Sequence, residues 1–298
     1  MTQPTSTMPV AALLNQPAAV QIVLAESYAQ RCIAGQVLTG VIDATGSGAA
    51  VIESAGLFTD FAPEVIPELA DYPLASAGQD HQIIPTSKWG LSTLVSAEAV
   101  ARNRFDLVKT RMSQMAATLA RAVDEVAFGA VKAAPLTMLP ASAPWGSANA
   151  DPLRDILTAA AMIEETDSGA SANVVVTTPM LWAEIVTASR VIESAPIDAA
   201  NNPVLTGNLF RFGGLSILKT TRDFGADALV CDSRMFGGIV VERIGGQGWS
   251  GSTSDLTAPE SRVEPLSGAD GWRISQRKVC APVISVPEAA VVIRAATA

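Results

Sequence analysis

Histidine, cysteine and aromatic residues are scarce in this chain of 298 residues. The chain has one histidine and three cysteines, and aromatic residues make up only 5% of it. A Ser-His-Asp triad would have to use His81, which we expect to lie solvated in a polar loop beside Asp80. Cys32, Cys231 and Cys280 are too far apart for a CxxC or zinc spacing, and we expect them to be partly buried free thiols of a reduced compartment.

Basic residues and long apolar runs are also scarce. Twenty Lys and Arg residues face 29 Asp and Glu residues, which gives a formal net charge of -9. This balance argues against a protein whose main task is to grip phosphate backbones. No run of roughly 18 apolar residues is present, so no membrane span is expected. The apolar stretch before Arg31, the first basic residue, is interrupted by polar side chains, and we expect no signal peptide.

One glycine-rich stretch has the spacing of a dinucleotide-binding motif. Residues 246–251 read G-x-G-x-x-G directly after the apolar run 239–244. A Rossmann fingerprint also needs a following helix and an acidic residue at the end of the next strand. Two prolines and no helical periodicity follow, and Glu264 falls within the same loop. A nucleophile elbow fails as well, because Ser252 stands where the second glycine should be. We therefore predict a surface loop that leaves a strand.

The remaining candidates for chemistry are few. Glu164 and Glu165 are adjacent, so on a helix they point in different directions and are expected to be solvated. Lys88 is the only lysine among the first 108 residues, and no Walker A sequence occurs. We expect no catalytic residue, no cofactor and no metal ion, and hence no enzyme.

The strongest structural signal is a long amphipathic helix at 96–131. Ser96 is its expected N-cap, and Glu98 lies near the positive end of the helix dipole. Apolar residues recur at steps of three or four residues, as on a helix with one buried face. These residues are Val100, Val108, Met112, Met115, Leu119, Val123 and Val126.

The other segments predict an α+β protein without an internal repeat. Residues 1–19 are expected to form a mobile arm and 20–34 a short helix. Residues 37–56 predict two strands joined by a Gly-Ser-Gly turn, within a Pro-rich and acidic excursion. Further on we expect a helix at 152–165, a buried strand at 173–178, a helix beginning at Pro179, strands within 210–244, a loop at 245–270 and closing strands at 271–294.

This order of parts resembles the major capsid proteins of tailed bacteriophages, which have the HK97-type fold. LSTLVSAEAVARNRFDLVKTRMSQMAATLARAVDEVAFGA is similar to the strand and spine helix of that family. NVVVTTPMLWAEIV is similar to the start of its axial domain, and FRFGGLSILKTT and ADALVCDSRMFGG to later strands. WRISQRKVCAPVISVPEAAVVI resembles the C-terminal strand pair. The resemblance covers roughly residues 20–298.

The resemblance implies a domain division and a set of partners. It gives an N-terminal arm (1–35), an extended loop or E-loop (36–94), a peripheral domain (95–150 and 263–298) and an axial domain (151–262). Copies of the chain are expected to form hexamers and pentamers of an icosahedral head around double-stranded DNA, with only weak non-specific contact to that DNA. A separate scaffolding protein, a portal and a decoration protein are the other expected partners, and the shell is expected to assemble in the bacterial host cytoplasm.

Some family members join subunits through Lys–Asn crosslinks. Because Lys88 lies at the base of the E-loop and not at its tip, no crosslink is expected here. Arg102 and Arg104, with the acidic residues at positions 60, 64 and 68, are candidates for charge pairing between subunits.

Two other readings remain open. An encapsulin-type compartment has a related shell fold, but its cargo groove involves an N-terminal helix, which residues 1–19 do not favour. A soluble enzyme that binds a nucleotide at 245–251 is the second alternative.

Overall fold

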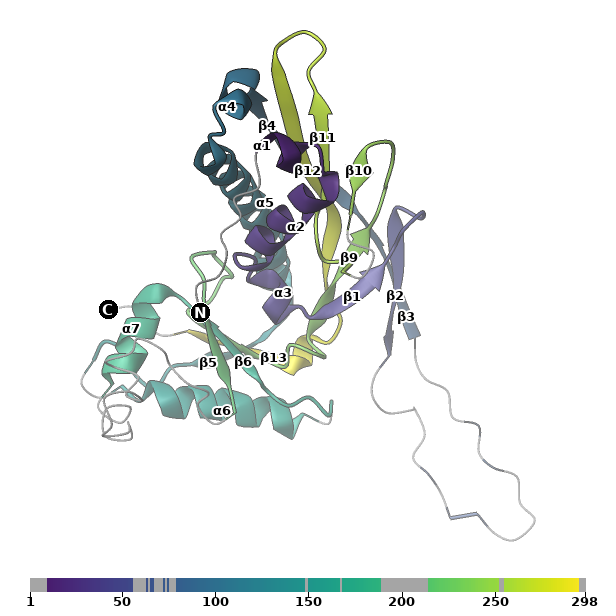
Figure 1. Cartoon of the computed structure of the whole chain (residues 1–298). Coiled ribbons are helices and arrows are strands. Elements are labelled where there is room, and N and C mark those ends of the chain that lie inside the picture. Colours follow the sequence, from purple (N-terminus) through teal and green to yellow (C-terminus); the bar gives the residue numbers. More distant parts are fainter. Residues whose placement is uncertain are drawn as a thin grey trace, which may run out of the picture.

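The computed structural model describes residues 10–55, 63, 65–66, 72, 74, 79–147, 150–166, 168–188, 214–251 and 255–294. Two sheets form two bodies that share one hydrophobic core, and a separate two-stranded hairpin projects from the side of the larger body (Figure 1). The mixture of helices with parallel and antiparallel strands confirms the predicted α+β class.

The larger sheet has β12 at its centre. Its order is β1-β9-β12-β11-β10, and β4 also pairs with β12. β12 is 14 residues long and pairs with β4 along most of its length. The strands are β1 (Gly40–Asp43), β4 (Ser87–Ser96), β9 (Gly237–Glu242), β10 (Trp249–Ser250), β11 (Glu260–Pro265) and β12 (Gly271–Ile284).

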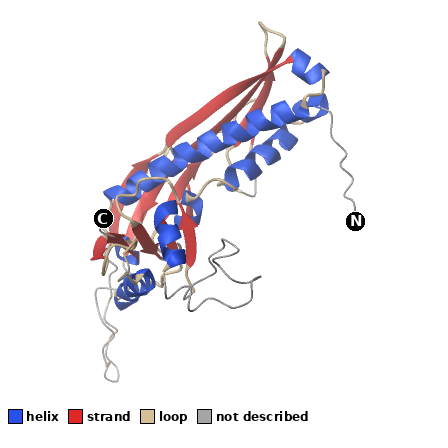
Figure 2. Ribbon diagram, turned by 90° about the vertical axis from the view of Figure 1, so that its left-hand side faces the viewer, coloured by secondary structure: helices blue, strands red, loops and turns tan. Residues whose placement is uncertain are grey.

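The long helix α5 (Phe105–Ala133) lies along the long strands of this sheet (Figure 2). Its 29 residues correspond to roughly 43 Å at 1.5 Å per residue. The predicted buried face is confirmed from Val108 to Val123, and it continues through Phe128 and Val131. The gaps in this stripe are filled by the buried alanines Ala116, Ala120 and Ala127.

The single helix predicted at 96–131 is interrupted. α4 (Ala97–Ala101) ends before Asn103, whose φ of 48° lies in the left-handed region that no continuous α-helix contains. The Asn103 side chain accepts a hydrogen bond from the N–H of Val10 at 2.9 Å, which ties this break to the N-terminal segment. Ser96 is the predicted N-cap, and its hydroxyl accepts from the Ala99 N–H.

The prediction of a mobile arm at 1–19 is wrong for its second half. α1 (Val10–Leu14) and α2 (Pro17–Ala29) are helices, and Val10, Leu13 and Leu14 are buried. Residues 1–9 lie outside the described residues. α2 packs on α5 and β11, and the short α3 (Ala34–Val37) follows. The two backbone N–H groups at 33 and 34 donate to the buried carboxylate of Asp124 on α5, which fixes the start of α3.

The smaller body is a five-stranded sheet of order β5-β13-β8-β6-β7. The predicted buried strand at 173–178 and the helices at 152–165 and from Pro179 are confirmed. α6 contacts β13 and β8 of this sheet. The elements are β5 (Thr137–Pro140), α6 (Pro152–Glu165), β6 (Val174–Thr177), α7 (Pro179–Thr187), β7 (Ser216–Lys219), β8 (Ala228–Cys231), the 3-10 helix Pro287–Ala289 and β13 (Ala290–Arg294).

The two strands predicted at 37–56 are present, but they do not pair with each other as predicted. β1 pairs in parallel with β9, and β2 (Ala49–Ala55) pairs with β3 (Gln79–Pro85) instead of with β1. β1 and β4, which lie within or at the end of the segment 36–94 expected as the E-loop, both belong to the larger sheet.

The two sheets also divide the chain differently from the expected domains. β9 and β10 were expected in the axial segment 151–262, but they belong to the larger sheet with β12. β5 and β13 were expected in the peripheral segments, but they belong to the smaller sheet with β6 and β8. Among the described strands the chain crosses between the two sheets three times: between β4 and β5, after β8 and after β12.

Candidate assembly surface

A small apolar cluster anchors the base of the β2–β3 hairpin to the larger sheet. Ala44 and Ala50 pack with Val240, Ala281 and Val283, separately from the main core. Thr86, which directly follows β3, donates its N–H to the Gly48 carbonyl at 3.0 Å and its hydroxyl to Glu242 of β9 at 2.6 Å. The hairpin base is thus fixed, and the direction in which the hairpin leaves the body is set by β1 and β9.

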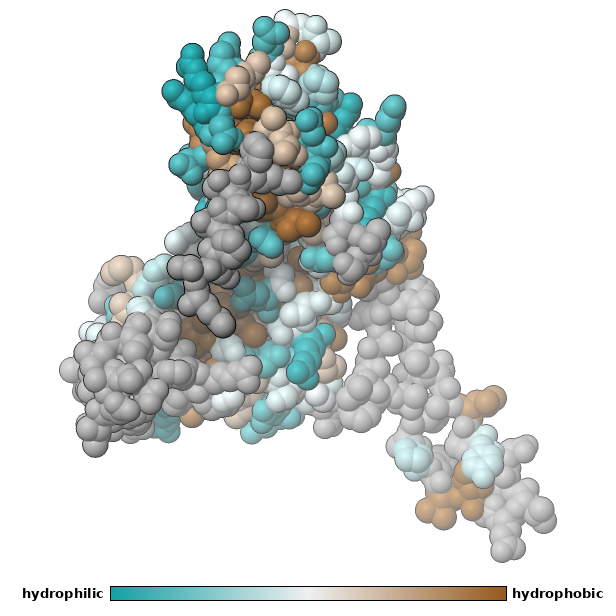
Figure 3. Space-filling model, viewed as in Figure 1, coloured by the Kyte–Doolittle hydropathy of each residue, from teal (hydrophilic) through white to brown (hydrophobic). Residues whose placement is uncertain are grey.

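Beyond this base the hairpin exposes apolar side chains. Val51 and Ile83 are directly opposite each other in the two strands, and they are 62% and 71% exposed. The described residues between the strands include Val65, Tyr72 and Leu74, each more than four-fifths exposed. Figure 3 shows hydrophobic surface on this side of the molecule. An isolated two-stranded ribbon with exposed apolar side chains is at best marginally stable, so this hairpin needs a covering partner.

The glycine-rich loop after β9 lacks the following helix that a dinucleotide-binding motif requires. In the described residues up to β11, β10, a turn at 256–258 and β11 come instead. The N–H of Gly245, directly before the motif, donates to Glu260 Oε1 at 3.0 Å, and Gly245 O accepts from Arg277. The backbone at Gly245 is therefore bonded to protein side chains. The predicted long loop at 245–270 is wrong in part, because it contains β10 and β11.

A buried ion pair holds this loop against the sheet. Arg277 Nε donates to Glu260 Oε2 at 2.7 Å, and the two side chains are only 6% and 10% exposed. The Arg277 guanidinium stacks over the Trp249 ring at 3.8 Å. This pair is not evident from the sequence, because its members are 17 residues apart and meet only through the β11–β12 register.

Replacing Arg277 with Leu is expected to lower the free energy of unfolding by about 3–5 kcal/mol, since it leaves the Glu260 carboxylate buried without its partner. The double variant Arg277→Leu/Glu260→Met should recover most of that loss, because no uncompensated charge remains. Urea unfolding of dissociated subunits measures the free energy of unfolding of both variants.

Arg273→Met is the matched control in the same strand. Arg273 pairs with Glu264 at 3.6 Å and is 47% exposed, so its loss should cost less than about 1 kcal/mol. Equal losses for Arg277→Leu and Arg273→Met would contradict the role given to the buried pair.

The other side chains considered for chemistry are dispersed. His81 lies in β3 opposite Glu53 and not in a loop, and Lys88 is exposed on β4. Glu164 and Glu165 are exposed at the end of α6. Glu264, the acid of the supposed dinucleotide motif, lies in β11 and forms an ion pair with Arg262 at 2.6 Å.

The three cysteines are free, as predicted, and they are fully buried where partial burial was expected. Burial raises the pKa of Cys231 to about 12 and that of Cys280 to about 11. Burial also raises the pKa of Cys32, beside Asp124. The thiolate is the reactive form, so these thiols are inert at neutral pH.

Arg102 and Arg104 are exposed at the break between α4 and α5. The acidic residues at 60, 64 and 68, their suggested partners, lie outside the described residues, and this pairing stays a prediction. In the described parts of the chain no group of three or more His, Cys, Asp or Glu residues could hold a metal ion. No helix in those parts is long and apolar enough to cross a membrane.

Comparison with known proteins agrees with this architecture. Residues 82–293 match the model of a family described as phage capsid protein. The capsid of the cyanophage P-SCSP1u aligns with a TM-score of 0.61 at 12% identity, over 88% of each chain. The virus-like particle of Pyrococcus furiosus aligns with a TM-score of 0.59 at 12% identity, over 93% of this chain and 98% of that one. A phage-related protein from Bordetella bronchiseptica aligns with a TM-score of 0.59 at 15% identity, over 92% of this chain and 96% of that one. No curated protein matches the chain.

A long helix along a long-stranded sheet, a second α/β body and a projecting hairpin define an HK97-type fold. The family match covers well over half of the sequence, and the chain belongs to the phage capsid protein family.

Proposed function

We propose that this chain assembles as hexamers and pentamers into the icosahedral head of a tailed phage, around double-stranded DNA. The observation that supports this most is the β2–β3 hairpin, whose exposed Val51 and Ile83 have no covering surface in the described part of their own chain. Repetition around a closed shell turns many modest contacts of this kind into a stable assembly.

The proposed domains of the subunit correspond to its two sheets. The larger sheet with α2 and α5 is the proposed peripheral domain, and the smaller sheet with α6 and α7 the proposed axial domain. The excursion around β2 and β3 is the proposed E-loop. The net charge of -9 supports only weak contact with packaged DNA, which suits later release. A separate scaffolding protein, a portal and a decoration protein remain proposed partners, with assembly in the host cytoplasm.

Native mass spectrometry of the purified chain tests the subunit grouping. Hexamers and pentamers are the expected species at moderate salt. A monomer at every protein and salt concentration tested would overturn the proposal.

An encapsulin-type compartment is the second candidate. The cargo groove of such a compartment involves an N-terminal helix, and α1 and α2 are helices in that part of the chain. Particles purified from the source organism separate the two functions: a phage head yields long double-stranded DNA, whereas a compartment yields a cargo protein in fixed ratio to the shell protein.

A further inference from the structure

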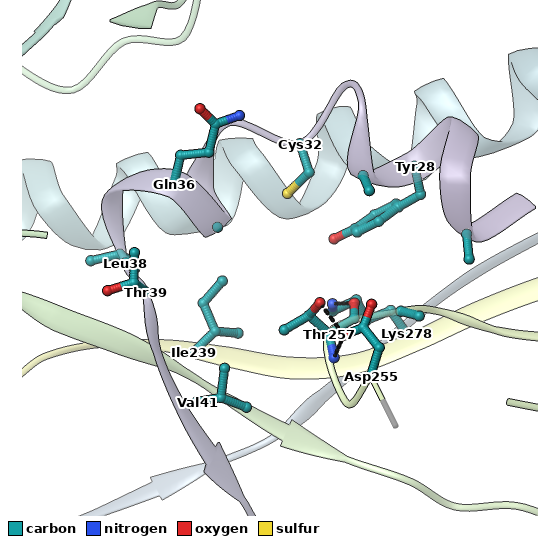
Figure 4. Close-up of a pocket in the computed structure, with 14 residues that line it drawn as sticks. Tyr28, Cys32, Gln36, Leu38, Thr39, Val41, Ile239, Asp255, Thr257 and Lys278 are labelled. Carbon is teal, nitrogen blue, oxygen red and sulfur yellow. Dashed lines mark hydrogen bonds between the residues drawn. The ribbon is translucent and has the colours of Figure 1, made fainter. Parts of the chain in front are cut away.

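A cavity of about 200 Å³ lies between the N-terminal helices and the larger sheet. Figure 4 shows Tyr28 and Cys32 on one side and Ile239, Val41 and the turn carrying Thr257 on the other. Exposed residues, among them Ala29 and Gln36, also line the cavity, so it opens to solvent. An engineered cavity of about 150 Å³ admits benzene, so this one has room for a chain of about six carbons.

Tyr28 brings a poorly satisfied hydroxyl to this cavity. The residue is 4% exposed, and the only side chain beside its hydroxyl in the described structure is the Cys32 thiol, a weak hydrogen-bond partner. Figure 4 shows the hydroxyl pointing into the space between the helix and the strands. Burial, with a smaller contribution from Cys32, raises the pKa of the phenol far above its usual range, so the group is a proton donor at neutral pH. A buried donor of this kind is costly until an acceptor reaches it.

Lys278 lines the same cavity and is also 4% exposed. Its ammonium donates to the Thr257 carbonyl and lies 4.9 Å from the centre of the Tyr28 ring. An ammonium has three donors, and burial lowers the pKa of this one. An anion beside it would offset the cost of burying the charge.

Three other titratable side chains act on Lys278. The Cys32 and Cys280 thiols have raised pKa values and are neutral at neutral pH. Asp255 lines the cavity, and its carboxylate accepts from the Thr257 N–H and hydroxyl at 2.8 and 2.5 Å. It is the one negative charge that would oppose an incoming anion among the described lining residues.

We propose that this cavity binds a small amphipathic carboxylate with an unbranched chain of about six carbons. The chain lies against Leu38, Val41 and Ile239, and the carboxylate accepts hydrogen bonds from the Tyr28 hydroxyl and the Lys278 ammonium. The described residues that line the site all belong to one subunit.

Isothermal titration calorimetry of the purified protein with hexanoate tests the proposal, with 1-hexanol and hexylamine as probes of equal chain length. Saturable binding of hexanoate, at least tenfold tighter than that of either probe, is expected. No saturable binding, or equal binding of hexanol, would overturn it.

Three variants assign the polar contacts. Tyr28→Phe keeps the ring and removes the poorly satisfied hydroxyl, so it should raise the melting temperature of the free protein. It should also raise the Kd of hexanoate about fivefold or more, because a hydrogen bond to a charged group is lost. Lys278→Met should raise the Kd of hexanoate at least tenfold, and Asp255→Asn should lower it. A Tyr28→Phe variant that binds hexanoate as the parent does would show a merely structural role and overturn the site.

Ala29→Leu covers the case in which Lys278→Met fails to fold. It narrows the exposed rim and leaves the buried polar groups in place. It should weaken the binding of hexanoate without changing the circular dichroism spectrum of the protein. Unchanged binding would count against this cavity as the site.

Discussion

The double variant Val51→Asp/Ile83→Lys is expected to fold normally and to form no closed shells under conditions where the parent chain assembles. The two side chains are directly opposite each other, so the opposite charges satisfy one another across the strands and the hairpin is preserved. Both are more than half exposed in the isolated subunit, so the subunit core is unchanged. What is lost is the apolar surface that each copy would bury against its neighbour.

The conservative swap Val51→Ile/Ile83→Val is the matched control, because it keeps the apolar character and the combined volume of the pair. It should assemble like the parent. Sedimentation velocity measures assembly, and circular dichroism of dissociated subunits reports the fold. Normal shell yield from the charged variant would contradict the assignment of this hairpin face to an intersubunit contact.

Gly238→Ala is expected to destabilise the subunit by about 3 kcal/mol, the upper part of the range for overpacking a tight site. A Cβ at this position would lie 2.5 Å from the Gly40 carbonyl oxygen and 2.8 Å from its carbon. These are backbone atoms of the adjacent strand β1, so a change of side-chain rotamer cannot relieve the clash. Because β1 leads into the hairpin, the same substitution should also displace the hairpin and reduce the yield of shells.

Gly129→Ala on α5 is the control for this prediction. Nothing lies within 4 Å of a Cβ built there, and alanine favours helix, so it should stabilise the subunit by about 0.5–1 kcal/mol. Thermal unfolding of both variants measures the difference. If Gly238→Ala unfolds at the parent temperature, β1 and β9 are not packed as closely as described.

Local patterns in the sequence predicted most of the elements. The periodicity from Val108 to Val123 predicted α5, and the apolar run before Pro179 predicted β6 and the start of α7, because each pattern lies within a single element. Between the glycines and β11 the described residues contain no helix, which was also predictable, since prolines and polar residues follow the glycines.

Pairing over long sequence distances was not predictable in the same way. β1 and β2 look like a local hairpin, yet β1 pairs with β9 about two hundred residues away, where Gly238 permits a close approach. The helix at 10–14 was missed because its surroundings are polar and its three buried side chains are stabilised by tertiary contacts rather than by helix propensity. The candidate cavity combines Tyr28, Ile239 and Lys278, which only the fold brings together.

Negative-stain electron microscopy of the purified chain tests directly whether the subunits form a shell. Closed icosahedral shells, or free hexamers and pentamers, are expected once salt and protein concentration favour association. A stable, monodisperse monomer across that whole range of conditions would contradict this expectation.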